Sequence, residues 1–162
     1  MSRIQAGAVA LRLEPTDLSD AVAAGLALIN RRGRHIEIRL DDTPLVIADP
    51  HLLERVVGNL LDNACKWSPS DGEVMVDAAR TGDRVALRVV DRGPGIARTR
   101  RAVAFAPLQR VGDGGAGGTD GLEGTGLGLA IANGFTQAMG GELRIEETPG
   151  GGATLVLTLG VA

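Results

Sequence analysis

Residues 59–66 read Asn-Leu-Leu-Asp-Asn-Ala-Cys-Lys, and this stretch decides which fold the sequence predicts. At about 100° per residue, a helix places Asn63 about 40° and Lys66 about 20° around the axis from Asn59, so the three side chains form one polar stripe. Apolar residues at helical spacing fill the neighbouring sector, namely Leu52, Val56, Leu60, Leu61 and Ala64. The stripe therefore borders a buried helix face.

The groups in this stripe suit a metal ion bound to phosphates. A carboxamide oxygen is a neutral, hard ligand that can hold Mg²⁺ while phosphates supply the negative charge. The ammonium of Lys66, near the end of the stretch, can pair with the same phosphates. Taken alone, an amphipathic helix with ordinary polar residues at its edge explains the pattern equally well.

A second candidate segment follows a predicted strand. Residues 85–90 alternate as a strand does and run into Asp91-Arg-Gly-Pro-Gly-Ile96. Two glycines around a proline allow a tight turn and let a ligand approach the backbone closely. Asp91 could accept a hydrogen bond from an exocyclic amine such as that of adenine. A plain turn after a strand is the alternative.

The third candidate segment is rich in glycine. Nine of the seventeen residues from Gly112 to Gly128 are glycine, so ordering the segment is entropically costly. We predict that residues 111–123 are mobile without a ligand, although a plain surface linker has the same composition. The segment ends in Gly124-Thr-Gly-Leu-Gly-Leu129 and a predicted helix through Met139. Backbone N–H groups at such a helix start can face an anion, although neither the P-loop nor the Rossmann spacing is met.

Together with Phe105-Ala-Pro-Leu-Gln-Arg110, these segments resemble the N, G1, F and G2 boxes of the catalytic and ATP-binding domain of sensor histidine kinases. That domain belongs to the GHKL superfamily, with gyrase, MutL and heat-shock chaperone ATPases. The resemblance covers nearly the whole chain, with Leu108 standing where a second Phe is common. It implies the Bergerat ATP-binding fold, a two-layer α/β sandwich in which about three helices back one mixed sheet, with a flexible ATP lid.

The resemblance also implies ATP and Mg²⁺ as ligands and assigns roles to single residues. Asn63 would be the main Mg²⁺ ligand with Asn59 assisting, and Asn59 and Lys66 would be the catalytic residues. Asp91 would meet the adenine amine. Trp67 would stack beside the base, or else plug the helix end. The remaining implied contacts are Gly93, Gly95 and Ile96 at the base, with Arg110, Gly124, Thr125, Gly126, Leu127, Gly128 and Leu129 at the phosphates.

Position 59 separates two kinds of reaction. Hydrolytic relatives carry a Glu there to activate water, whereas the carboxamide of Asn59 cannot take a proton. Glu54 lies on another helix face, and neither His35 nor His51 has the sequence context of a phosphoacceptor. The sequence therefore predicts a protein-histidine kinase domain that donates the ATP γ-phosphate to a histidine on a separate dimerisation domain. A GHKL-type ATPase and a regulatory nucleotide-binding module are the alternatives.

Other stretches resemble KdpD-type potassium-responsive kinases, among them the runs that begin at Ala48, Phe105 and Gly134. Residues 1–10 look like the end of a dimerisation helix and its linker, and residues 11–162 like the catalytic domain. The implied partners are the dimerisation domain of the parent kinase and a cognate response regulator. The implied location is a cytoplasmic domain of an inner-membrane parent.

The composition fits one domain with an aliphatic core. The chain has 162 residues, of which 44% are hydrophobic but only 2% aromatic. A net charge of −3 gives no reason to expect nucleic-acid binding or direct membrane contact. Cys65 is the single cysteine, so no internal disulfide can form, and we expect it to be buried.

Local patterns predict the remaining elements. Strands are expected at residues 11–15, 35–40 and 45–48, with Ile36, Ile38 and Leu40 on one face of the second. A helix should run from Thr16 or Asp17 to about Arg31. The other expected elements are a helix from Pro50, a hairpin of residues 73–79 and 84–90, and strands at residues 142–147 and 153–159.

Overall fold

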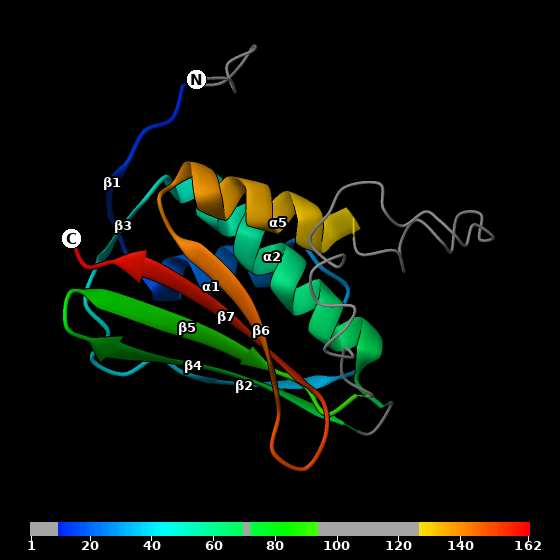
Figure 1. Cartoon of the computed structure of the whole chain (residues 1–162). Helices are drawn as coiled ribbons and strands as arrows, with labels where there is room; N and C mark the ends of the chain where they lie inside the picture. Colours follow the sequence, from blue (N-terminus) through cyan, green and yellow to red (C-terminus); the bar gives the residue numbers. More distant parts are fainter. Residues whose placement is uncertain (1–9, 70–71, 94–126) are drawn as a thin grey trace.

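A computed structural model describes residues 10–69, 72–93 and 127–162 of the chain. Within these ranges, three helices cover one face of a five-stranded sheet (Figure 1). The strand order is β2-β4-β5-β7-β6. The elements are α1 (Leu18–Ala27), α2 (Pro50–Trp67), α5 (Leu127–Ala138), β2 (His35–Arg39), β4 (Glu73–Thr81), β5 (Arg84–Val90), β6 (Glu142–Glu147) and β7 (Ala153–Gly160).

The sheet is mixed because one of its four strand pairs is parallel. β2 runs parallel to β4, whereas β4–β5, β5–β7 and β6–β7 are antiparallel. The β4–β5 hairpin closes at the pair Thr81↔Arg84 around Gly82, whose φ is +65°. The expected two-layer α/β sandwich with a mixed sheet is therefore confirmed.

A separate two-stranded ribbon departs from the expectation of one sheet. β1 (Glu14–Thr16) pairs antiparallel with β3 (Val46–Ala48) and with no strand of the large sheet. The strand expected at residues 11–15 is thus shifted toward the C-terminus. The apolar alternation misled the prediction, because pairing with β3 and the bond from the buried Thr16 hydroxyl to the Ala48 carbonyl oxygen (3.1 Å) fix the position of β1.

Helix α1 begins as expected but ends earlier than Arg31. The side chain of Asp17 accepts a hydrogen bond from the Ser19 amide, as an N-cap does. The helix ends at Ala27, and the chain then reaches positive φ at Arg32 (+55°) and Gly33 (+78°). Residues with positive φ cannot continue a right-handed helix, so the apolar spacing past Ala27 overestimated its length.

Helix α2 is the central element of the helical layer and packs against both α1 and α5. The carboxylate of Asp49 caps it by accepting from the amides of His51 (3.0 Å) and Leu52 (3.2 Å). Pro50 occupies the first turn, where no intrahelical amide bond is lost. The side of α2 that faces the core is buried: Leu53, Val56, Val57, Leu60, Leu61, Ala64 and Cys65.

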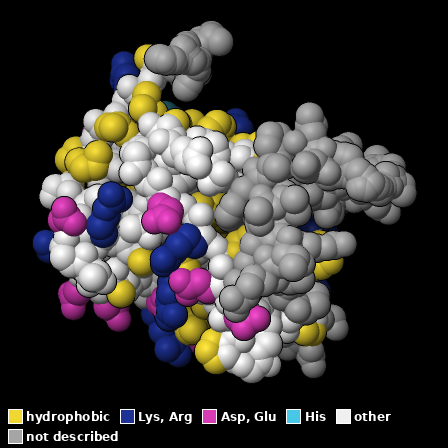
Figure 2. Space-filling view, in the orientation of Figure 1, with side chains coloured by type: hydrophobic (Ala, Val, Ile, Leu, Met, Phe, Trp, Pro, Cys, Tyr) yellow, Lys and Arg dark blue, Asp and Glu magenta, His cyan; other side chains and the backbone are white. Residues whose placement is uncertain are grey.

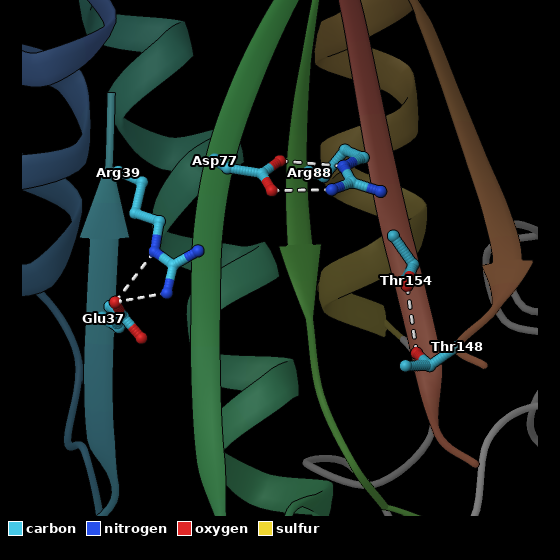
Figure 3. A network of polar contacts seen from close by, with 6 residues as sticks. All are labelled: Glu37, Arg39, Asp77, Arg88, Thr148 and Thr154. Atoms are coloured by element: carbon cyan, nitrogen blue, oxygen red, sulfur yellow. Dashed lines mark hydrogen bonds and ion pairs between the residues drawn. The ribbon is translucent and has the colours of Figure 1, made fainter. Parts of the chain in front are cut away.

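The two faces of the sheet differ in chemistry. The face toward the helices is aliphatic, with buried Val74, Val76, Val85, Leu87, Val89, Leu155 and Leu157. The opposite face carries ion pairs between Asp77 and Arg88 and between Glu37 and Arg39, drawn in Figure 3. Figure 2 shows acidic and basic side chains interspersed on the visible surface. The expected strand is confirmed as β2, an edge strand in which Ile36 is buried and Ile38 keeps 43% exposure.

Two helical glycines should respond oppositely to alanine. A Cβ on Gly25 in α1 would lie 3.0 Å from the Gly58 backbone nitrogen in α2, so Gly25→Ala should destabilise the fold by about 1–3 kcal/mol through overpacking. A Cβ on exposed Gly134 in α5 would meet no atom within 4 Å. Gly134→Ala should therefore stabilise by about 0.5–1 kcal/mol. Urea unfolding measures both, and equal effects would contradict the close α1–α2 contact.

Candidate functional site

The polar stripe of α2 lies along its edge, as the sequence predicts. Asn59, Asn63 and Lys66 are each partly buried, and together they span the C-terminal half of the helix. The ammonium of Lys66 is 3.9 Å from a carboxylate oxygen of Asp62, and Arg32 lies 4.0 Å from the other. Lys66 keeps 19% of its side chain exposed. The Lys66 ammonium is therefore held on the same helix edge as the two neutral carboxamides, at the rim of the core.

One end of the stripe meets the start of α5. A Cβ on Gly128 would lie 3.6 Å from the Asn59 carboxamide oxygen, so the first turn of α5 lies against that side chain. The first amides of a helix have no intrahelical acceptor and carry a partial positive charge. The predicted helix after the glycine-rich segment is confirmed, and its start faces the stripe. Its Leu129 side chain is buried in the core.

The other end of the stripe meets the chain just after β5. A Cβ on Gly93 would lie 2.2 Å from the Trp67 carbonyl oxygen, so no residue with a side chain fits there. Trp67 sits at this junction with 45% of its surface exposed, which is too much for a buried plug of the whole ring. From Asn59 to Trp67 the helix rises about 12 Å, which gives the site an elongated shape.

Asp91 is the buried carboxylate of the site. It is 2% exposed, and its Oδ1 accepts from the amides of Gly93 (2.8 Å) and Ala153 (3.2 Å). Burial raises the pKa of the Asp91 carboxyl, and the two amide hydrogen bonds offset part of that rise. Both bonds go to Oδ1, so Oδ2 is the oxygen that a donor on a ligand would meet.

The turn between β6 and β7 supports Asp91 from behind. A Cβ on Gly152, whose φ is +111°, would lie 2.1 Å from the Asp91 carbonyl oxygen. The Thr148 hydroxyl donates to that oxygen (3.2 Å), and Arg92 Nη1 donates to the Pro149 carbonyl oxygen (2.8 Å). The sequence identified this turn only as a connection, and no local signal indicated its contact with Asp91.

The structure brings together seven of the predicted site residues around α2: Asn59, Asn63, Lys66, Trp67, Asp91, Gly93 and Gly128. Outside the described residues lie Gly95, Ile96, Arg110, Gly124, Thr125 and Gly126, together with residues 1–9 and the predicted mobile segment 111–123. His35 and His51 are exposed, and Cys65 is buried. Burial raises the pKa of the Cys65 thiol, so the thiol is unreactive, as expected.

Comparison with known proteins links this geometry to one family. The model of the "Histidine kinase-, DNA gyrase B-, and HSP90-like ATPase" family matches residues 48–162. Over 163 residues the chain is 45% identical to the sensor protein KdpD of Rathayibacter rathayi, with 100% of this chain covered. It is 39% identical over 166 residues, 98% of this chain, to KdpD of Mycobacterium tuberculosis strain H37Rv. The chain spans 18% of the length of each of these relatives.

Solved structures agree with the sequence relatives. The mycobacterial sensor histidine kinase MprB matches with a TM-score of 0.76 and 30% identity, over 93% of this chain and 98% of that one. Full-length ShkA in complex with AMPPNP matches with a TM-score of 0.76 and 28% identity, over 99% of this chain and 34% of that one. Among the described residues, no helix is both long and apolar enough to cross a membrane.

The buried carboxyl of Asp91 should make stability depend on pH. Because its pKa is raised in the folded state, its favourable contribution is complete below the unfolded pKa and is lost as pH rises through the folded value. Asp91→Asn keeps an oxygen for the two amides and removes the buried charge. Without ligand, the variant should therefore unfold at higher urea than wild type at pH 7, and the difference should shrink in acid.

The control for this measurement is Asp83→Asn, which removes a charge from the exposed β4–β5 hairpin. It should unfold like wild type at both pH values. If Asp91→Asn were no more stable than wild type at neutral pH, the result would contradict a pKa raised by burial in the folded state.

Proposed function

Because this chain belongs to the histidine kinase-, DNA gyrase B- and HSP90-like ATPase family and is the ATP-binding domain of a sensor histidine kinase, we propose that it binds ATP along α2 and donates the γ-phosphate to a histidine on another domain. One observation carries the proposal. Backbone closes on both ends of the polar stripe, Gly128 at Asn59 and Gly93 at Trp67. A nucleoside triphosphate laid between these ends has its base at Asp91 and its phosphates at the start of α5.

At the end of the site that would hold the base, Asp91 would select adenine. Its Oδ2 would accept a hydrogen bond from the exocyclic amine of adenine, whereas guanine presents a carbonyl oxygen at that position and would meet a carboxylate. Trp67 lies half exposed beside Gly93, where its indole could stack on the base. By the family resemblance, Gly95 and Ile96, which lie outside the described residues, would also contact the base.

The phosphate end fits Mg²⁺ by the chemistry of its donors. Asn63 would be the main ligand and Asn59 the second, with phosphate oxygens supplying the charge. Among the described residues, no cluster of three or more His, Cys, Asp or Glu side chains could hold a metal, so an ion here would depend on carboxamides and on the nucleotide. When bound, Mg²⁺ would neutralise charge on the phosphates. Lys66 would pair with a phosphate oxygen, and Arg110 and residues 124–126 would add donors.

The proposed reaction is phosphoryl transfer to a protein side chain and not to water. Asn59 holds the position from which a carboxylate would activate water, and its amide cannot accept a proton. The acceptor would be a histidine of the dimerisation domain in a longer, KdpD-like parent anchored in the inner membrane, with residues 1–10 as the end of that domain. A cognate response regulator would then receive the phosphoryl group. The second candidate function, slow ATP hydrolysis, would need a base from outside the described residues.

Asn63 should link Mg²⁺ to nucleotide affinity. In Asn63→Ala, ATP affinity measured by calorimetry should respond far less to Mg²⁺ than in wild type, because loss of the metal ligand costs about 1–3 kcal/mol. Emission of Trp67, the only tryptophan, gives a second reading of binding. The control Gln137→Ala removes an exposed carboxamide nine residues beyond Gly128 and should bind as wild type does. Full Mg²⁺ dependence in Asn63→Ala would remove this residue from the metal site.

The chain by itself should not phosphorylate itself and should hydrolyse ATP very slowly. The reason is the missing base at Asn59 and the absence of an acceptor context at His35 and His51. After incubation with Mg·ATP, mass spectrometry under mildly alkaline conditions should find both histidines unmodified. Adding a dimerisation domain from the parent protein should produce phosphohistidine on the added domain alone. Phosphate on His35 or His51 would contradict the proposal.

A further inference from the structure

Two buried threonines lie beside Asp91, Thr148 in the β6–β7 turn and Thr154 at the start of β7. Thr148 is 5% exposed and Thr154 is 4% exposed, and their hydroxyl oxygens are 3.0 Å apart (Figure 3). The Thr148 hydroxyl also lies 3.2 Å from the backbone carbonyl oxygen of Asp91. Neither threonine belongs to the polar stripe or to the glycine-rich segments, so the binding site as proposed leaves their hydroxyls without a role.

Proton counting fixes the direction of this chain of hydrogen bonds. The Asp91 carbonyl oxygen can only accept, so Thr148 must donate its single hydroxyl proton there. Thr148 then has no proton left for its neighbour, and Thr154 must be the donor in the 3.0 Å contact. The relay runs from Thr154 to Thr148 to Asp91. Hydrogen bonds in such a series strengthen one another when water is excluded.

The start of β7, which directly follows this turn, holds the carboxylate of Asp91 as well as its backbone. Ala153, the residue before Thr154, donates its amide to Oδ1 (3.2 Å) and accepts from the Asp91 amide (2.9 Å). The Thr148 amide in turn donates to the Gly152 carbonyl oxygen (3.0 Å), which closes the turn. Any shift of the turn therefore moves the partner of Oδ1 and changes the direction in which Oδ2 points.

We propose that Thr148 and Thr154 are positioning residues that fix the Asp91 carboxylate and so set the preference of the site for adenine over guanine. The inference rests on the proposed role of Asp91 in reading the base. A carboxylate free to rotate could still meet an amine, but it would discriminate less against a base that presents a carbonyl oxygen there. Discrimination depends on fixed geometry, because the penalty arises from an acceptor that cannot turn away.

The test measures dissociation constants of Mg·ATP and Mg·GTP for the same chain. Thr148→Val replaces the hydroxyl by a methyl of similar shape, and the ATP preference should fall roughly 3- to 10-fold, as expected for one lost buried hydrogen bond. Thr148→Ser restores the donor and should recover most of the preference. The matched control is Thr158→Val. Thr158 lies on the same face of β7 as Thr154, but it pairs with Ala86, five residues before Asp91. It should leave the preference unchanged.

A double-mutant cycle separates positioning from general loosening of the fold. In an Asp91→Asn background, Thr148→Val should cause no further loss of preference, because the group on which it acts is already altered. A folded Thr148→Val with wild-type preference, or an equal further loss in the Asp91→Asn background, would overturn the inference. If Thr148→Val fails to fold, Thr154→Val should show the loss, and wild-type preference there overturns the relay. Unchanged preference in Asp91→Asn alone would instead refute base recognition by Asp91, and the inference with it.

Discussion

Helix α2 carries the candidate ligand site, and backbone from two other segments comes close to the two ends of its polar stripe. At the C-terminal end the approach is so tight that a Cβ on Gly93 would lie only 2.2 Å from the Trp67 carbonyl oxygen. At Asn59, a Cβ on Gly128 in the first turn of α5 would be in van der Waals contact with the carboxamide. Backbone has no rotamer entropy to lose, so the fold itself fixes these two boundaries of the candidate site.

The position of α2 is in turn held by two kinds of contact. Its inner face lies in an aliphatic core with almost no aromatic residues, where packing is distributed over many small contacts. Its outer neighbour α1 comes close at Gly25 and Gly58, where the two backbones nearly touch. At the start of α2, Asp49 caps the helix with Oδ1 and accepts the Arg12 amide with Oδ2 (2.9 Å). One carboxylate thus anchors the helix and the segment before β1 together.

Asp91 shows that the site is not optimised for stability. This carboxylate is 2% exposed, and within the described residues its hydrogen bonds come from two neutral amides, so it loses solvation on folding, as its raised pKa indicates. An asparagine would fill the same volume and keep the acceptor on Oδ1. The retained charge gives Oδ2 a strong acceptor character toward a ligand, and the fold supports it with a turn closed by Gly152 and Thr148. The proposed role of Asp91 in binding the base explains a buried charge that lowers the stability of the fold.

The sequence could predict the parts of the site that lie within single elements. The stripe of Asn59, Asn63 and Lys66 follows from helical spacing, and Asp91 follows from its place after a strand. What escaped prediction depends on contacts between distant segments. Thr148 and Gly152 lie about sixty residues from Asp91, and a glycine-rich turn looks the same in sequence whether it faces solvent or a buried carbonyl.

The early end of α1 and the exposure of Ile38 also could not be read from the sequence, because positive φ at Arg32 and the edge position of β2 leave no mark on apolar periodicity. Periodicity therefore located the candidate ligand groups, whereas the residues that hold Asp91 in place became visible only when the sheet brought the β6–β7 turn against the end of β5.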